Sequence, residues 1–271
     1  MLYKKLKNMR TIYRFVILFY LTLIPVVLHA SIEVVGKLKH VKTGNSGDIY
    51  KGRIKIQNSG DYAQEVRVYQ TDLLYNYEDY TLYDPPVTHN RSNANWIQYS
   101  PKTTIVNAKE TQFIQYEVSI PKNDTISGTY WSVLMVEGVN PIDPNEEGKL
   151  NINTITRYAI QIVTEIGDKG LGELQFMEPT IINEGGKIFL AIDIINSGDH
   201  YISPEVSLEL YDENGVSMKK IEAGRKGIFP TTSTRFRVDL EGIEGNKTYQ
   251  AIIIAAGKDD DVFGIEYTLY F

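Results

Sequence analysis

Short segments that alternate apolar and polar residues run along the chain from about residue 32 to its end. They include residues 48–58, 65–74, 113–120 and 157–166 in the first half and 187–196, 205–215, 235–240, 249–257 and 263–271 in the second. A period of two is typical of β-strands with one buried face. Residues 129–138 are more continuously apolar, which predicts a central strand. Asn, Gly, Asp and Pro separate the segments, so we predict an all-β protein.

The tetrapeptide Asn-Ser-Gly-Asp occurs twice, at residues 58–61 and 196–199, each time directly after an alternating segment. Further blocks follow both copies in the same order. Aligning these blocks pairs Pro101 with Pro230 and Tyr130 with Tyr249. The repeated order predicts one fold used twice, with each tetrapeptide forming the turn after a strand, because Asn and Gly tolerate a left-handed backbone. A calcium loop is the alternative, although such a loop needs about six to eight converging oxygen atoms.

The spacing of the segments fits an immunoglobulin-like β-sandwich, in which strands follow one another roughly every 8–12 residues. The blocks that contain Tyr130 and Tyr249 are similar to the tyrosine corner of such sandwiches, in which the hydroxyl bonds to an upstream backbone group. We therefore expect two tandem immunoglobulin-like β-sandwich domains, residues 31–167 and 168–271, joined by a glycine-rich hinge at residues 167–173.

The first 30 residues have the features of a signal peptide. Five basic residues and no acidic ones accompany an apolar segment at residues 15–28, and Ala30 follows it. A basic start, a short apolar centre and a small residue at the end are typical of a secretory signal, and the apolar segment is short against the ~20 residues of a spanning helix. We expect export to the periplasm or the cell surface with cleavage after Ala30, so that membrane contact is transient. An uncleaved membrane anchor is the alternative.

The charge of the chain disfavours some partners. Its formal net charge is −6, and removal of residues 1–30 takes away five positive charges, which leaves −11. Such a surface repels phosphate backbones, so we expect no nucleic-acid partner. The chain has no cysteine, which excludes disulfides and thiol chemistry.

Catalytic and metal-binding motifs are hard to find. The three histidines after residue 30 are His40, His89 and His200, and none has the spacing of a metal site. The sequence contains neither a G-x-S-x-G nucleophile motif nor a glycine-rich nucleotide loop. We therefore expect no enzyme activity, no catalytic residues, no metal and no cofactor.

Residues 53–61, 96–121, 128–138 and 156–166 follow one another in the order turn, extended strand, aromatic strand and final alternating strand. In these blocks the first domain resembles the N-terminal domain of PapD-like periplasmic pilus-assembly chaperones, so both sandwich domains are expected to be PapD-like. A similar order occurs in the tandem domains of WxL-interacting surface proteins of Gram-positive bacteria. The chaperone resemblance implies an assembly factor whose last strand completes an unfinished sandwich of a pilus subunit by β-strand pairing.

The resemblance assigns the donated side chains to the final strand of the first domain. They would be Tyr158, Ile160, Ile162 and Ile166. In the chaperones, a Lys of this strand and an Arg of the first strand hold the terminal carboxylate of the subunit. Here Ala159 stands where that Lys is expected, and the first strand offers Lys37 and Lys39. The alternative is that residues 158–166 form an ordinary paired strand of the first domain.

Residues 74–99 have no counterpart in the second half and form an aromatic insertion. The candidate binding residues in this insertion are Tyr75, Tyr77, Tyr80, Tyr83, Arg91, Trp96 and Tyr99. Exposed tyrosines offer a large contact area at a low entropic cost and suit glycans or protein partners. The alternative is a long hairpin whose aromatic side chains cover one edge of the sandwich.

These observations together predict an exported, non-enzymatic protein-interaction module. In one version it is a chaperone or assembly factor for pilus or envelope proteins, and its partner is a secreted or pilin-like subunit. In a second version it is a cell-surface protein that recognises polysaccharide or peptidoglycan through the tyrosine-rich insertion. A scaffold subunit of an envelope complex is a third possibility.

Overall fold

The computed structural model describes residues 32–139, 155–167, 172–257 and 261–270. Within these ranges nearly all regular structure is β-strand, and the one helical element is a 3₁₀ turn, η1 (Ala94–Trp96), so the all-β prediction is confirmed. The expected signal peptide lies outside the described residues. Among those that are described, no helix has the length and apolar character to cross a membrane.

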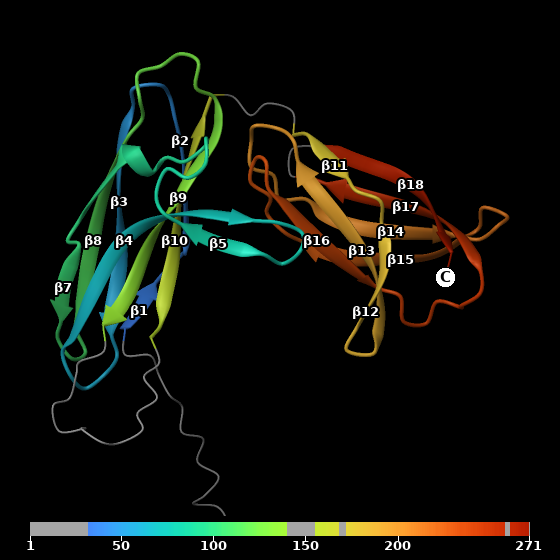
Figure 1. Cartoon of the computed structure of the whole chain (residues 1–271), viewed down its shortest axis with the longest axis horizontal. Coiled ribbons are helices and arrows are strands. Elements are labelled where there is room, and N and C mark those ends of the chain that lie inside the picture. The colour runs from blue at the N-terminus through green and yellow to red at the C-terminus, as the bar shows by residue number, and fades with distance from the viewer. Residues whose placement is uncertain (1–31, 140–154, 168–171, 258–260, 271) are drawn as a thin grey trace, which may run out of the picture.

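The first domain is a sandwich of two sheets (Figure 1). One sheet contains, in spatial order, β1 (Ile32–Val35), β3 (Ile49–Asn58), β8 (Thr111–Ser119) and β6 (Ile97–Ser100). The other sheet contains, in spatial order, β2 (Lys39–Gly44), β10 (Arg157–Ile166), β9 (Gly128–Val139), β4 (Gln64–Tyr75) and β5 (Thr81–Asp84), with β7 (Thr103–Val106) beside β4.

The second domain repeats this arrangement. One sheet is built on β13 (Lys187–Asn196), which pairs with β11 (Leu174–Phe176), β12 (Thr180–Glu184) and β16 (Ser233–Asp239). The other contains, in spatial order, β15 (Ser217–Arg225), β14 (Glu205–Tyr211), β17 (Thr248–Ala256) and β18 (Val262–Tyr270). The order β14-β17-β18 matches β4-β9-β10 of the first domain, which confirms two tandem sandwiches of one design. The expected boundary lies beside residues 168–171, outside the described residues.

Alternating residues of the strands fill the two cores. Ile54 and Ile56 of β3 are buried in the first core, and Leu190 and Ile192 of β13 are buried in the second. Each such side chain contributes about 1.5–3 kcal/mol by leaving water. Ile49 of β3 points to the other face and is 63% exposed.

The two Asn-Ser-Gly-Asp turns have the same hydrogen bonds. Asn58 donates through Nδ2 to the carbonyls of Tyr62 (2.7 Å) and Val106 (2.9 Å), and its Oδ1 accepts the Gly60 N–H (2.9 Å). In the second domain Asn196 makes the corresponding bonds. They run to the His200 carbonyl (2.7 Å), the Ile228 carbonyl (2.9 Å) and the Gly198 N–H (3.0 Å). Each tetrapeptide is therefore a turn that ties its strand to a distant loop.

These bonds correct the alignment of the two halves. Val106 and Ile228 are equivalent, and three residues beyond them Lys109 and Thr231 both have φ of 63°. Pro230 is therefore equivalent to Ala108, and the pairing of Pro101 with Pro230 is wrong. A shared Pro was a weak marker because proline suits many turn positions.

The tyrosine corner forms in one domain. The Tyr249 hydroxyl donates to the Glu244 carbonyl (3.0 Å), as expected. Tyr130 differs, because its ring packs against Trp96 (centroids 4.7 Å apart), and the described residues show no hydrogen bond from its hydroxyl. The insertion thus changes the chemistry of this position.

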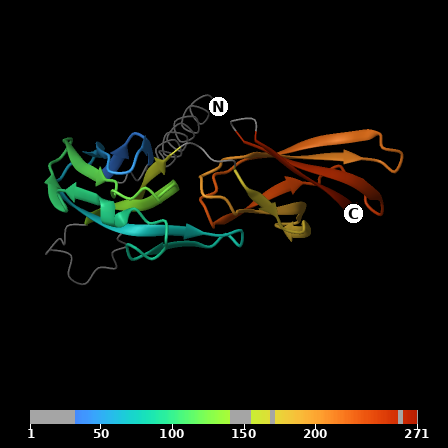
Figure 2. The same cartoon turned by 90° about the horizontal axis from the view of Figure 1, so that it is seen from above.

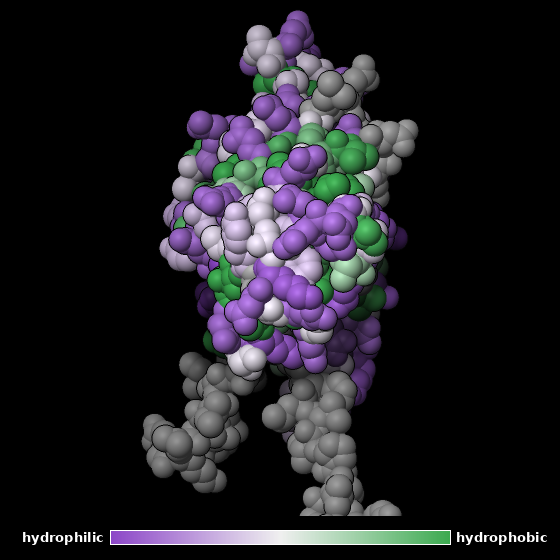
Figure 3. Space-filling model, turned by 90° about the vertical axis from the view of Figure 1, so that its right-hand side faces the viewer, coloured by the Kyte–Doolittle hydropathy of each residue, from purple (hydrophilic) through white to green (hydrophobic). Residues whose placement is uncertain are grey.

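The hairpin of β4 and β5 extends from the first domain toward the second (Figure 1), and the view from above shows the same (Figure 2). Viewed from the right-hand side of Figure 1, the surface is mostly hydrophilic with smaller hydrophobic patches (Figure 3).

Candidate functional site

The residues expected to be donated to a partner lie in the core of the first domain. Ile160 and Ile162 are fully buried in that core, Ile166 is 3% exposed, and Tyr158 packs against the core half-buried. These side chains are therefore not free for a partner unless the sandwich opens. This burial fits the alternative interpretation, in which residues 158–166 are a paired strand of their own domain.

The pairing of β10 leaves part of its edge open. Antiparallel β9 covers one side along the whole strand, whereas parallel β2 covers the other side only from Gln161 to Ile166. The remaining residues, Arg157–Ile160, pair on one side among the described residues. β1 does not close this gap, because it pairs with β3 in the other sheet.

A change of sheet between β1 and β2 produces this open edge. The chain leaves β3 after Val35 and passes Gly36, whose φ of 117° is a conformation that favours glycine. It then joins β10 in the opposite sheet. The sequence predicts one first strand over residues 32–41, which the structure corrects to two strands in different sheets.

β2 is the outermost strand of its sheet and has a definite inner and outer side. The Gln161 N–H donates to the Leu38 carbonyl (2.8 Å), so in a parallel ladder Leu38, His40 and Lys42 direct their backbone groups to β10. The backbone groups of Lys39, Val41 and Thr43 consequently point away from β10. Among the described residues no strand pairs with this outer side.

Apolar side chains accompany the open edge. Val35, Leu38 and Val41 are 41%, 45% and 44% exposed. An exposed apolar edge strand is a template on which another chain can pair. The edge therefore offers both backbone groups and apolar contact area to a partner strand.

The Lys39 ammonium group is not free to bind a carboxylate, which is the role that the resemblance assigns to a cation of the first strand. Its Nζ lies 3.2 Å from the centroid of the Tyr201 ring and 4.7 Å from that of Phe229, both in the second domain. Burial lowers the pKa of Lys39 to about 8, against the attraction of Glu165. Lys37 is exposed, and Ala159 packs half-buried at the domain junction.

The first part of the insertion joins the two domains. The Tyr75 hydroxyl donates to the Gly227 carbonyl (2.8 Å) and accepts the Phe229 N–H (3.1 Å). Burial raises the pKa of Tyr75 to about 12, so the hydroxyl stays protonated. The Tyr77 N–H donates to Ser233 Oγ (3.1 Å).

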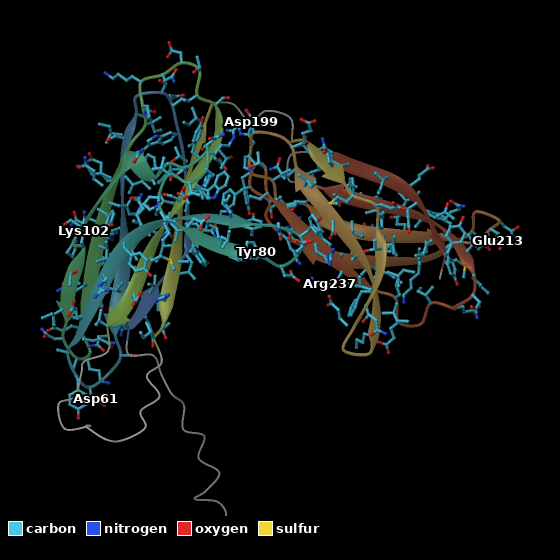
Figure 4. All side chains as sticks on the ribbon, viewed as in Figure 1. Asp61, Tyr80, Lys102, Asp199, Glu213 and Arg237 are labelled. Carbon is cyan, nitrogen blue, oxygen red and sulfur yellow. The ribbon has the colours of Figure 1, made fainter. Side chains whose placement is uncertain are left out.

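Charged groups strengthen this junction. Arg235 lies over the Tyr77 ring, with its guanidinium carbon 5.6 Å from the centroid. Arg237 forms an ion pair with Asp79 of the hairpin. Figure 4 shows Arg237 on the side of the second domain that faces the hairpin. The hairpin is thus a brace that holds the second domain.

The rest of the insertion does not gather into one face. Tyr80 and Tyr83 are exposed, whereas Trp96 and Tyr99 pack against the first core. Arg91 donates to the Ser127 carbonyl (2.9 Å). The structure therefore separates the seven predicted ligand-binding residues into junction, surface and core positions.

A buried aromatic stack at the junction was not predicted from the sequence. His89 stacks on Trp131 (4.3 Å between centroids), and Trp131 stacks on Phe229 of the second domain (4.5 Å). Trp131 also donates through Nε1 to the Leu73 carbonyl (2.8 Å). The sequence signal for this stack was the continuously apolar β9. A strand that is apolar on both faces must pack against the core on one face and against another element on the other, here Phe229 of the second domain.

A buried carboxylate lies beside this stack. Asp72 accepts hydrogen bonds from the Thr88 N–H and from Ser92 Oγ, each at 2.7 Å, and lies 3.8 Å from His89 Nε2. Burial lowers the pKa of His89, and the Asp72 charge opposes that shift. In the part of the chain that the structure describes, no cluster of three or more His, Asp or Glu residues could hold a metal ion.

No protein-family model matches the chain, and no curated protein matches its sequence. Solved structures that are similar to it include fimbrial chaperones. The YadV chaperone is 14% identical over 89% of this chain and 100% of its own, with a TM-score of 0.46. A chain from the complex of the SafA pilin with the SafB chaperone of Salmonella enterica is 13% identical over 90% and 98%, with a TM-score of 0.45.

A chain from the CsuC–CsuE chaperone–tip adhesion subunit complex of Acinetobacter baumannii is 13% identical over 88% of this chain and 98% of its own, with a TM-score of 0.46. All three structures are of a chaperone or of a complex that contains a chaperone, the class of protein that the first domain resembles in sequence. At such low identity the likeness concerns the fold alone.

Proposed function

We propose that this chain is an exported, non-enzymatic assembly factor that binds a secreted or pilin-like protein by β-strand pairing at the open edge of its first domain. The observation that carries the proposal is the strand order β2-β10-β9, in which β2 ends the sheet and β10 is uncovered at Arg157–Ile160. Backbone pairing gives affinity in this mode, and side-chain contacts give specificity.

The proposal differs from the sequence-based version in the groups that contact the partner. The buried side chains of β10 stabilise the domain itself and are not free for a partner. We propose instead that the partner strand pairs with the outward backbone groups of Lys39, Val41 and Thr43 on β2. The exposed side chains of Val35, Leu38 and Val41 add apolar area. Secretion and a periplasmic or surface location are part of the proposal and are supported by the basic and apolar pattern of residues 1–30.

Site-specific crosslinking in the cell of origin tests the proposal. A photoactivatable residue at position 41 should crosslink one exported protein, because a paired strand lies about 5 Å from the edge. The same residue at position 218, where Met218 is 57% exposed on β15 of the second domain, is the matched control. Equal crosslinking from both positions, or none from position 41, contradicts the proposal.

Proline substitution separates backbone pairing from side-chain contact. Val41→Pro removes an outward N–H and should abolish crosslinking from position 38, whereas Val41→Thr keeps that N–H and should retain most of it. Both variants must show the circular dichroism of the parent chain. If the partner still crosslinks from position 38 in the Val41→Pro variant, the proposed strand pairing at this edge is wrong.

A further inference from the structure

A groove of about 740 Å³ lies between β2 and β3. Its lining includes six lysine and arginine residues and no Asp or Glu residue, although the Lys39 ammonium group packs on Tyr201 and Phe229 of the second domain. The six basic residues are Lys37, Lys39, Lys42, Lys51, Arg53 and Lys55. The chain as a whole carries 34 acidic and 28 basic residues, so this concentration of positive charge is not a consequence of composition.

Most of these cations have no partner among the described residues. Lys51 forms an ion pair with Glu117 (3.0 Å), and the negative charge of Glu165 attracts the Lys39 ammonium group. Lys37, Lys42, Arg53 and Lys55 form no ion pair within the described part of the chain, although Arg53 lies over the Phe113 ring, 4.9 Å from its centroid. Like charges that are held together without counterions cost free energy, and an anionic ligand would offset that cost.

The spacing of the cations on β3 has the period of an extended peptide. Lys51, Arg53 and Lys55 alternate along one strand, so their side chains leave the same face about 6.6–6.8 Å apart. Side chains on one face of a bound extended peptide have the same repeat. A carboxylate at every second position of such a peptide would therefore meet one cation each.

Open backbone edges border the groove on both sides. β2 exposes its outer side, and β3 is covered by β1 only from Lys55 to Asn58, so Ile49–Ile54 pair with β8 alone among the described residues. A polypeptide can bond to such an edge in register, whereas a polysaccharide cannot. This distinction favours a peptide over an anionic glycan.

Gly52 of β3 and Tyr116 of β8 line the groove and pack closely on each other. The Tyr116 ring fills the place above Gly52, where an added Cβ would come within 2.2 Å of that ring. The Tyr116 hydroxyl and His40 Nδ1 lie 2.8 Å apart in a hydrogen bond that joins β8 to β2. Val35 and Phe113 add apolar walls, which suits a peptide that carries apolar residues among its acidic ones.

We propose that this basic groove binds an extended segment of the partner protein in which acidic residues occupy alternate positions. The inference rests on the proposed function, because it names the chemistry of the strand that reaches the open edge. It predicts that the partner is recognised by charge pattern in addition to backbone pairing.

Fluorescence anisotropy with short peptides tests the inference on the purified chain. A labelled octapeptide of alternating Glu and Thr should bind, and its affinity should fall as salt rises from 0.05 to ~0.5 M, because screening shortens the reach of exposed charges. Two control peptides replace Glu by Gln, or group the four Glu residues in one block. The Gln peptide should bind far more weakly, and the block peptide should bind more weakly than the alternating one.

Matched variants assign the binding to the groove. Arg53→Gln with Lys55→Gln should weaken the alternating peptide by roughly threefold to thirtyfold, as expected for two exposed ion pairs. Lys102→Gln with Lys122→Gln removes two exposed cations that do not line the groove and should change nothing. Equal losses in both double variants overturn the inference.

Other anions provide the remaining outcomes. If the block peptide, polyphosphate or a heparin oligosaccharide binds as tightly as the alternating peptide, the groove is a general anion site and the inference is wrong. The proposed function has a separate readout in the crosslink from position 41. If the native partner still crosslinks to the Arg53→Gln/Lys55→Gln variant at full yield, the inference about the basic groove is wrong. Strand pairing at the open edge is then still supported.

Discussion

At the residue scale, two asparagines fix the turns on which the repeated fold depends. The sequence identified both Asn-Ser-Gly-Asp copies as turns from residue type alone. It did not identify the distant carbonyls of Val106 and Ile228, because these approach only when the sandwich closes. The same limit explains the wrong pairing of Pro101, since local turn chemistry carries no information about long-range partners.

Removal of one of these asparagines should destabilise its domain. Asn58→Ala leaves two carbonyls without their donor and should lower the free energy of unfolding by about 2–4 kcal/mol. Chemical denaturation measures the change, and Asn196→Ala should give a similar loss. Asp61→Asn in the same turn is the control, because Asp61 is exposed and should leave the midpoint unchanged. Equal effects of Asn58→Ala and Asp61→Asn contradict the role of the asparagine.

Two histidines should make stability depend on pH. Burial lowers the pKa of both His40 and His89 in the folded chain below the ordinary 6.5. Below pH 6.5 the unfolded chain therefore binds more protons, so stability is full above that pH and falls as pH drops toward the folded pKa values. Urea unfolding at pH 7.5, 6.5 and 5.5, values spaced about one unit around that threshold, should show this loss.

The double variant His40→Gln/His89→Gln provides the control for this pH dependence. It should flatten the part of the pH profile just below 6.5, since the two titrating groups are gone. An unchanged slope in the variant would assign the effect to other groups.

At the element scale, most strands were predicted from the alternation, and their neighbours were not. The period of two identified β10 correctly as a strand with a buried face. The same period could not distinguish a face buried in its own core from one that is offered to a partner, because both require apolar residues. The parallel pairing of β2 with β10 was also hidden, since β1 and β2 are separated by only three residues and join different sheets.

Proline at neighbouring positions should report which side of β2 is open. Val41→Pro removes an outward N–H and should cost little, whereas Lys42→Pro removes a bond to β10 and should cost roughly 3 kcal/mol or more. Denaturation of the two variants provides the comparison. If Val41→Pro is the more damaging substitution, the assigned inner and outer sides of β2 are wrong.

At the scale of the whole molecule, the tyrosine-rich insertion acts as a brace between the domains. The sequence showed an aromatic surface but not what it covers, because Gly227 and Phe229 lie some 150 residues further along the chain. Tyr75 and Tyr77 contact the second domain, so this part of the insertion has a structural role and is not a free binding face. The exposed Tyr80 and Tyr83 leave the ligand-binding alternative as an untested prediction.

Loss of the central ring of the junction should uncouple the domains. Phe229 is 1% exposed and packs on Trp131, Tyr75 and Tyr201, so Phe229→Ala should cost about 3–5 kcal/mol and separate the unfolding of the two domains into two calorimetric transitions. Phe113→Ala, at an exposed ring of β8, should keep the transition of the parent chain. A single unshifted transition in Phe229→Ala would show that the brace does not couple the domains.

Hydrogen exchange at single amides of β2 tests the open edge most directly. It is measured on the unmodified chain, alone and with the partner that the crosslinking experiment identifies. In the free chain the amides of Lys39, Val41 and Thr43 should exchange fast, while those of His40 and Lys42, which bond to β10, should be protected. The partner should slow Val41 and Thr43 and leave Lys42 unchanged. Fast exchange of Val41 and Thr43 in the complex would contradict strand pairing at this edge.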